Sequence, residues 1–176
     1  MNNLIFVIAQ IIGIVAFIVS LIAYHRDKKE KILGNMVVSY AFNLFHYFLL
    51  GAYSGCVTKA IAICRDLFII SKDKKKKAST NIYLYIFILI YILVGIFTYT
   101  NIWSIFPIIA AIIYIIPVWN GDEKIVKKAA FICYFLWLVY NICVCSISGV
   151  TSNVISIISV FIAIRRKNNT DLEIEQ

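Results

Sequence analysis

The sequence has no polar stretch long enough to form a soluble domain. Of its 176 residues only 15% are charged and 62% are apolar, and the mean hydropathy is +0.88, whereas a soluble domain is about half apolar. The apolar residues come in runs of roughly 17 to 21 residues, the length of a helix that crosses a bilayer. Strands of a membrane barrel alternate apolar and polar residues, and these runs do not, so the sequence predicts helices.

Motifs of catalytic and metal sites are also missing. The sequence contains no Gly-x-Ser-x-Gly, no His-Glu-x-x-His and no pair of intramembrane carboxylates. Its five cysteines lie in or beside apolar runs and lack the paired spacing of a zinc site. We therefore expect a protein that is not an enzyme and that holds no metal and no other cofactor.

The apolar runs predict an all-α, polytopic membrane bundle with seven transmembrane helices in a single domain, residues 1–176. Seven spans of about 18 residues use roughly 126 positions, which leaves no room for a soluble catalytic domain. The first run has no basic stretch before it, so we expect it to be retained rather than cleaved as a signal peptide. The predicted spans are 4–24, 34–51, 54–71, 82–99, 102–118, 129–147 and 149–165, followed by a polar tail at 168–176.

The basic residues predict the orientation of the chain. Of 17 lysines and arginines, 15 lie in the loops after spans one, three and five or in the tail at 165–167. The turns after spans two, four and six have none. Cytoplasmic loops of membrane proteins carry the positive excess, so we expect the N-terminus outside and the C-terminus in the cytoplasm. The net charge of +8 then reflects topology and contact with lipid headgroups, not a nucleic-acid partner.

A weak internal repeat accompanies this layout. Shifting the chain by 94 residues places spans two and three on spans six and seven, with identities that include Tyr40 on Tyr134 and Ser54-Gly55 on Ser148-Gly149. Two such units in the same orientation form a parallel repeat. We expect repeat one at about 4–71, a linker helix at about 82–99 and repeat two at about 102–165. The alternative is that any two apolar hairpins align this well.

Polar residues within the spans are informative, because burying them in hydrocarbon costs free energy. Lys59, Arg65 and Asp66 all lie in span three, and Gln10 lies on a small and polar stripe of span one. We expect Arg65 and Asp66 to form a structural or gating pair, and we place Gln10 in the same class. Lys59 lines a pathway in one interpretation, and in the other it extends its ammonium group to the outer interface.

The remaining candidate residues lie at a similar depth along their spans. A site built from both repeats at the outer depth of Lys59 would bind the substrate. Serine and glycine faces are more often packing seams than pathways, and an intramembrane histidine is often a hydrogen-bonded core residue. The predicted substrate-binding residues are Asn43, His46, Lys59, Tyr140, Asn141 and Asn153.

Three short motifs resemble the YgjV family of bacterial inner membrane proteins. They are Ala9-Gln10, the stretch from His46 to Ala52 that closes span two, and Arg65 in span three. The resemblance covers most of the chain and implies a multi-pass protein of the bacterial cytoplasmic membrane. It implies no particular activity.

The layout of three, one and three spans also resembles SWEET sugar carriers and PnuC vitamin-precursor transporters. In SWEET-like proteins an asparagine on the third and on the seventh helix contacts the sugar. Asn153 matches on span seven, but Lys59 stands at the position on span three. The Pro-Gln pair of each SWEET-like repeat is also absent, since Pro107 is followed by Ile108. These differences argue against a sugar and favour an anionic or carboxylate-bearing solute.

Two functions remain open from the sequence. The first is a carrier or permease for a small polar or anionic metabolite, and the second is a membrane scaffold or assembly partner that transports nothing. Its expected surroundings are the lipid bilayer, and the sequence is compatible with a homo-oligomer.

Overall fold

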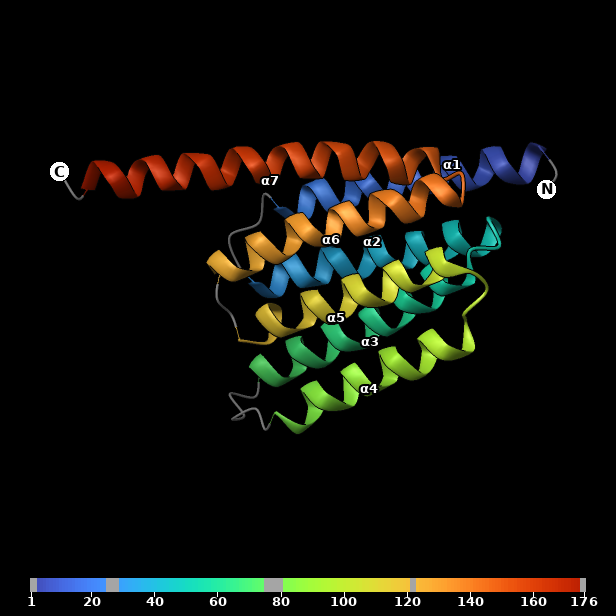
Figure 1. The fold of residues 1–176 in the computed structure, drawn as a ribbon, viewed down its shortest axis with the longest axis horizontal. Helices are drawn as coiled ribbons and strands as arrows, with labels where there is room; N and C mark the ends of the chain where they lie inside the picture. The colour runs from blue at the N-terminus through green and yellow to red at the C-terminus, as the bar shows by residue number, and fades with distance from the viewer. Residues whose placement is uncertain (1–2, 25–28, 75–80, 121–122, 175–176) are drawn as a thin grey trace.

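The structure, a computed structural model, describes residues 3–24, 29–74, 81–120 and 123–174. In these ranges the chain forms seven α-helices and one short 3₁₀ helix, with no strand. Figure 1 shows the α-helices side by side, running in alternating directions, so that α1 begins at one end of the bundle and α7 ends at the other. The prediction of an all-helical chain is confirmed.

The helices cover the predicted spans but differ from them at several ends. α2 and α6 begin earlier than predicted, because lysine and glutamate are good helix formers and extend the helices into the charged segments. α7 continues beyond the predicted end at residue 165, since neither glycine nor proline follows Gly149 to stop it. The bounds are α1 Asn3–Tyr24, α2 Lys29–Leu49, α3 Tyr53–Lys74, α4 Ile82–Phe97, η1 Ile102–Ser104, α5 Ile105–Asn120, α6 Glu123–Cys143 and α7 Ile147–Ile174.

The outer surface of the bundle is apolar. Large hydrophobic side chains such as Ile11 of α1 and Phe97 of α4 are exposed, as expected for a surface in contact with hydrocarbon. Among the described residues, three helical segments are long and apolar enough to cross a membrane: Asn3–Ile22, Glu30–Leu49 and Ile102–Trp119. Shorter apolar helices are Ile82–Phe97, Lys128–Cys143 and Ile147–Ile162.

Six of the helices form a closed ring. α1 packs on α2 and α2 on α3, and in the same way α5 packs on α6 and α6 on α7. We call α1–α3 the first group and α5–α7 the second group. Two seams join the groups, one between α1 and α7 and the other between α3 and α5. α4 lies outside the ring against α3 and α5, so it covers only the second seam.

The turn between α2 and α3 has the same hydrogen bonds as the turn between α6 and α7. Gly51 and Cys145 occupy matching places in the two turns and have left-handed φ angles of 68° and 55°. In each turn the next residue donates its N–H to the carbonyl five residues back, at 2.9 Å. This pattern is a Schellman motif, which satisfies the free carbonyls at a helix end. We call the end of the bundle where both turns lie the turn end.

A second pair of matching hydrogen bonds ties neighbouring helices together within each group. Ser39 Oγ donates to the carbonyl of Ala16, at 2.8 Å, and links α2 to α1. Cys133 Sγ donates to the carbonyl of Ala110, at 3.1 Å, and links α6 to α5. Adding 94 to the residue numbers of Ala16 and Ser39 gives those of Ala110 and Cys133. Small residues at both contacts let the helix backbones approach closely.

We expect Gly149→Ala to destabilise the protein. An added Cβ would lie 2.5 Å from Asn141 Oδ1 and would also contact Ser146 Oγ, and overpacking of this kind costs about 1–3 kcal/mol. The control is Gly34→Ala, where the new methyl group meets no atom within 4 Å and alanine favours the helix by roughly 0.5–1 kcal/mol. Thermal unfolding in detergent should show a lower melting temperature for the first variant only. Equal melting temperatures would contradict the close packing at the start of α7.

Candidate functional site

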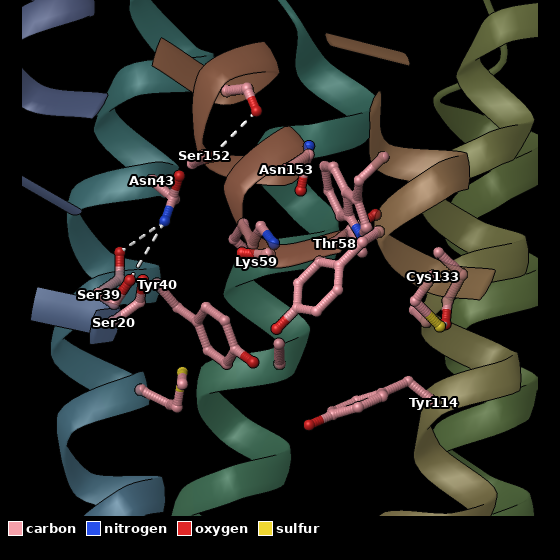
Figure 2. Close-up of a pocket in the computed structure, with 18 of the residues that line it drawn as sticks. Ser20, Ser39, Tyr40, Asn43, Thr58, Lys59, Tyr114, Cys133, Ser152 and Asn153 are labelled. Atoms are coloured by element: carbon pink, nitrogen blue, oxygen red, sulfur yellow. Dashed lines mark hydrogen bonds between the residues drawn. The ribbon is translucent and has the colours of Figure 1, made fainter. Parts of the chain in front are cut away.

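The ring encloses a cavity of about 140 Å³. Its lining comes from all seven α-helices and mixes polar groups with aromatic rings and small apolar side chains. Figure 2 shows Tyr40 and Asn43 of α2, Lys59 of α3, Tyr114 of α5 and Asn153 of α7 around it. The lining residues with polar side chains are Ser20, Ser39, Tyr40, Asn43, Tyr47, Thr58, Lys59, Arg65, Tyr91, Cys133, Tyr114, Tyr134, Trp137, Asn141, Ser152, Asn153 and Ser156.

Lys59 of α3 points into the ring. Its ammonium nitrogen lies 3.8 Å from the centroid of the Trp137 ring and 5.1 Å from that of Tyr40. A cation above an aromatic face is attracted by the ring quadrupole, so these rings hold the side chain inside the bundle. Within the described ranges, no carboxylate lies close enough to Lys59 to form an ion pair. Asp66 attracts the ammonium group from beyond ion-pair distance, but this carboxylate is already paired with Arg65.

Arg65 and Asp66, also on α3, form a buried ion pair. Arg65 Nε lies 2.7 Å from Asp66 Oδ1, and the two side chains are 3% and 1% exposed. The guanidinium carbon also lies 5.7 Å from the centroid of the Tyr114 ring. Burial of both partners together avoids the high cost of an unpaired charge in a low-dielectric interior. The pairing expected from the sequence is present, and a gating role remains a prediction.

The three asparagines of the lining differ in how they are held. Asn43 Nδ2 donates to the carbonyl of Ser39 at 3.0 Å. Asn141 Oδ1 accepts from the Tyr47 hydroxyl at 2.9 Å. Asn153 is buried, and its side chain makes no hydrogen bond to any described residue. Because Asn153 lines the cavity, its amide is free to make hydrogen bonds to whatever the cavity holds.

Above the cavity, at the turn end, hydrogen bonds join the two groups. We call this set the inter-group layer. Tyr140 Oη accepts from Ser54 Oγ and from the Gly55 N–H, both at 3.0 Å. At the seam between α1 and α7, Gln10 Nε2 donates to the carbonyl of Cys145 at 3.3 Å, and Gln10 Oε1 accepts from the Ser148 N–H at 3.0 Å.

His46 belongs to the inter-group layer and does not line the cavity. Its Nδ1 lies 2.6 Å from the carbonyl of Ala9, and its Nε2 lies 2.7 Å from Ser146 Oγ. A carbonyl only accepts, so Nδ1 carries the proton and the Ser146 hydroxyl donates to Nε2 of the neutral ring. Ser146 Oγ in turn accepts from the Gly149 N–H at 3.0 Å. Both ring nitrogens are thus satisfied by the protein.

The structure divides the predicted substrate-binding residues into two sets. Four of them line the cavity: Asn43, Lys59, Asn141 and Asn153. The other two, His46 and Tyr140, lie in the inter-group layer. Tyr140 also packs on Tyr47 and Trp137, with ring centroids 6.0 and 5.7 Å away, and it lines a smaller hollow of about 110 Å³ near the turns. Tyr140 therefore lines the hollow and contacts two residues, Tyr47 and Trp137, that line the central cavity.

A sequence model of the Imp-YgjV family, described as "Bacterial inner membrane protein", matches residues 7–171. The chain belongs to this family. No curated protein and no solved structure gave a significant match. The match covers both groups and α4, so the cavity and the inter-group layer lie within the part of the chain that makes it an Imp-YgjV protein.

Several functional candidates of this Imp-YgjV protein were not found by sequence reasoning. Trp137 and Tyr114 face the two cations, and Tyr91 reaches the cavity from α4. Tyr91 is fully buried, and its hydroxyl interacts with the Arg65–Asp66 pair. The 94-residue shift pairs Tyr40 with Tyr134, and this match could have identified both as lining residues from the sequence. In the described ranges, no group of three His, Cys, Asp or Glu could hold a metal ion.

Tyr140→Phe should weaken the inter-group layer of this Imp-YgjV protein. The change removes the acceptor of Ser54 and Gly55 and leaves two buried donors unpaired, which costs about 1–3 kcal/mol for each group. We expect a clearly lower melting temperature in detergent. The matched control is Tyr85→Phe on the exposed face of α4, which should change nothing. An unaltered melting temperature for Tyr140→Phe would show that the hydroxyl does not hold the groups together.

Proposed function

We propose that this inner membrane protein is a seven-span carrier for a small polar or anionic solute, with the central cavity as its binding site. The observation that supports it most is a polar, partly unpaired lining inside a bundle whose outer surface is apolar. Polar groups inside a membrane are costly and are retained mainly on substrate and ion pathways. In the inter-group layer the side chains of His46, Gln10 and Tyr140 are hydrogen-bonded, although the Ser148 hydroxyl is not. In the cavity, Lys59 has no ion pair and Asn153 no side-chain hydrogen bond among the described residues.

Seven spans are supported by the way the helices pack. α3, α4, α6 and α7 lie alongside the three helices whose segments are long and apolar enough to cross a membrane. Helices packed side by side in one bundle occupy the same slab of the bilayer. The charged residues in the middle of α3 do not oppose this, because Arg65 and Asp66 are buried against each other. The positive-inside rule then places the N-terminus outside and the C-terminus in the cytoplasm.

Two like-oriented repeats are supported by contacts that recur after 94 residues. The recurring features are the two Schellman turns, the bonds that Ser39 and Cys133 make, and the neighbour order within the ring. Tyr47 and Asn141 are 94 residues apart and bond to each other, as expected for equivalent residues near a two-fold axis. Carriers built from parallel repeats place their substrate sites at the repeat interface, which is where this cavity lies.

The first test of a carrier is flux. Protein in liposomes should take up at least one member of a labelled panel of small sugars, amino acids and carboxylates, and the uptake should saturate. Lys59→Ala combined with Asn153→Ala should reduce that uptake at least fivefold, because both residues line the cavity. Lys72→Ala is the control, since Lys72 lies against Trp119 near the end of α3 and outside the cavity lining. Uptake no greater than in empty liposomes, or a double variant equal to wild type, would contradict the proposal.

The second test separates a carrier from a scaffold. In a cysteine-free protein, single cysteines at positions 43, 59 and 153 should react with a membrane-impermeant, water-soluble maleimide, because a carrier's cavity is hydrated. A cysteine at position 46 should react slowly, because His46 is 1% exposed. Position 93 of α4 is the lipid-facing control, where Leu93 is exposed on the apolar surface. Silence at all three cavity positions would favour a scaffold with a dry interior.

A further inference from the structure

The charges that line the cavity do not cancel. Lys59 and Arg65 both line it, and Asp66 neutralises Arg65 at 2.7 Å. The ammonium group of Lys59 lies against the aromatic rings of Trp137 and Tyr40, and Asp66, which attracts it from beyond ion-pair distance, is already paired with Arg65. Within the described residues, the cavity lining and its ion pair therefore carry one excess positive charge. A buried charge without a partner is strongly unfavourable, so one negative charge would complete the site.

The groups around Lys59 suit the anionic end of a small molecule and not its apolar end. The ammonium group can donate three hydrogen bonds and accept none, and the Asn153 amide is free to donate as well. The lining also holds aromatic and small apolar side chains, among them Trp137, Tyr40 and Ala110. The site thus pairs a donor-rich, cationic end with a short apolar wall.

The volume limits the size of the occupant. At about 30 Å³ for each water molecule in the liquid, a cavity of about 140 Å³ holds on the order of four or five water-sized groups. A phosphate ester or a dianion brings a second negative charge for which the described lining offers no free cation. A cation would be repelled by Lys59, and a neutral sugar would leave that charge uncompensated.

We propose that the cavity binds a small monocarboxylate anion, with the carboxylate on the Lys59 ammonium group and the Asn153 amide and the short carbon chain against Trp137 and Tyr40. This assignment rests on the proposed function, because it takes the carrier's cavity as the binding site and specifies its substrate class. Acids of two to four carbons fit the volume.

Binding to detergent-purified protein tests the assignment independently of transport. Propionate and lactate should raise the melting temperature in a saturable way at constant ionic strength. Propionamide and lactamide, which have nearly the same shape without the charge, should not raise it at the same concentrations. Sodium chloride is the second comparison, since a halide would also supply one negative charge.

Variants of Lys59 test whether this residue binds the acids. Lys59→Gln should weaken propionate and lactate binding at least tenfold, whereas Lys59→Arg, which keeps the charge, should retain part of it. Lys72→Gln should bind as wild type does. If Lys59→Gln fails to fold, the comparison of acids with amides on the wild-type protein still decides the question.

Four results would overturn the monocarboxylate assignment: no stabilisation by the acids, equal stabilisation by the amides, equal stabilisation by chloride, or undiminished binding by a folded Lys59→Gln variant. Saturable uptake of neutral solutes alone would leave the carrier in place and reject this substrate class. Carboxylate binding with no uptake of any solute would reject the carrier and retain the binding site.

Discussion

The cost of placing charged side chains in hydrocarbon governs the arrangement of this bundle. α3 carries Lys59, Arg65 and Asp66, and each would cost roughly 2.5–3.5 kcal/mol near the centre of a lipid-facing helix. α3 avoids that cost because α2, α4 and α5 surround it. Arg65 and Asp66 then neutralise each other, and Lys59 rests on Trp137. An apolar exterior and a polar interior follow from enclosing this one helix.

The interior itself has two zones that differ in how completely polar groups are paired. At the turn end, His46 and Gln10 each use both of their polar side-chain atoms in hydrogen bonds. In the cavity, the side chain of Asn153 on α7 has no hydrogen-bond partner in the described part of the chain. Full pairing suits a closure that holds helices together, and incomplete pairing suits a site that exchanges its occupant. Tyr140 marks the boundary between the two zones.

Sequence patterns predicted the helices, the Arg65–Asp66 pair and the inward position of Asn43 and Asn153, and they left Lys59 open between a pathway and the outer interface. These follow from run length and from the cost of polar groups in lipid. The surroundings of His46 could not be predicted, because depth along a helix gives a residue's height and not its neighbours. Its partners are the carbonyl of Ala9 and the hydroxyl of Ser146, which come from two other parts of the chain.

Tyr91 was missed for a different reason. The helix around it is almost uniformly apolar and aromatic, so no polar stripe distinguishes its inward face. Only the contacts of α4 with α3 and α5 identify that face. The early start of α2 and the long α7 were missed because charge was taken to end a helix, although lysine and glutamate favour helices.

The position of α4 makes the two seams between the groups mechanically unequal. The seam between α3 and α5 has a third helix laid across it, and the seam between α1 and α7 has none. The unbraced seam depends on the Gln10 bonds and on the close approach of Gly13 to Ser148. Among the described residues, α4 therefore adds contacts across the seam between α3 and α5, and the seam between α1 and α7 is held by the contacts of those two helices and by the hydrogen bonds of Gln10.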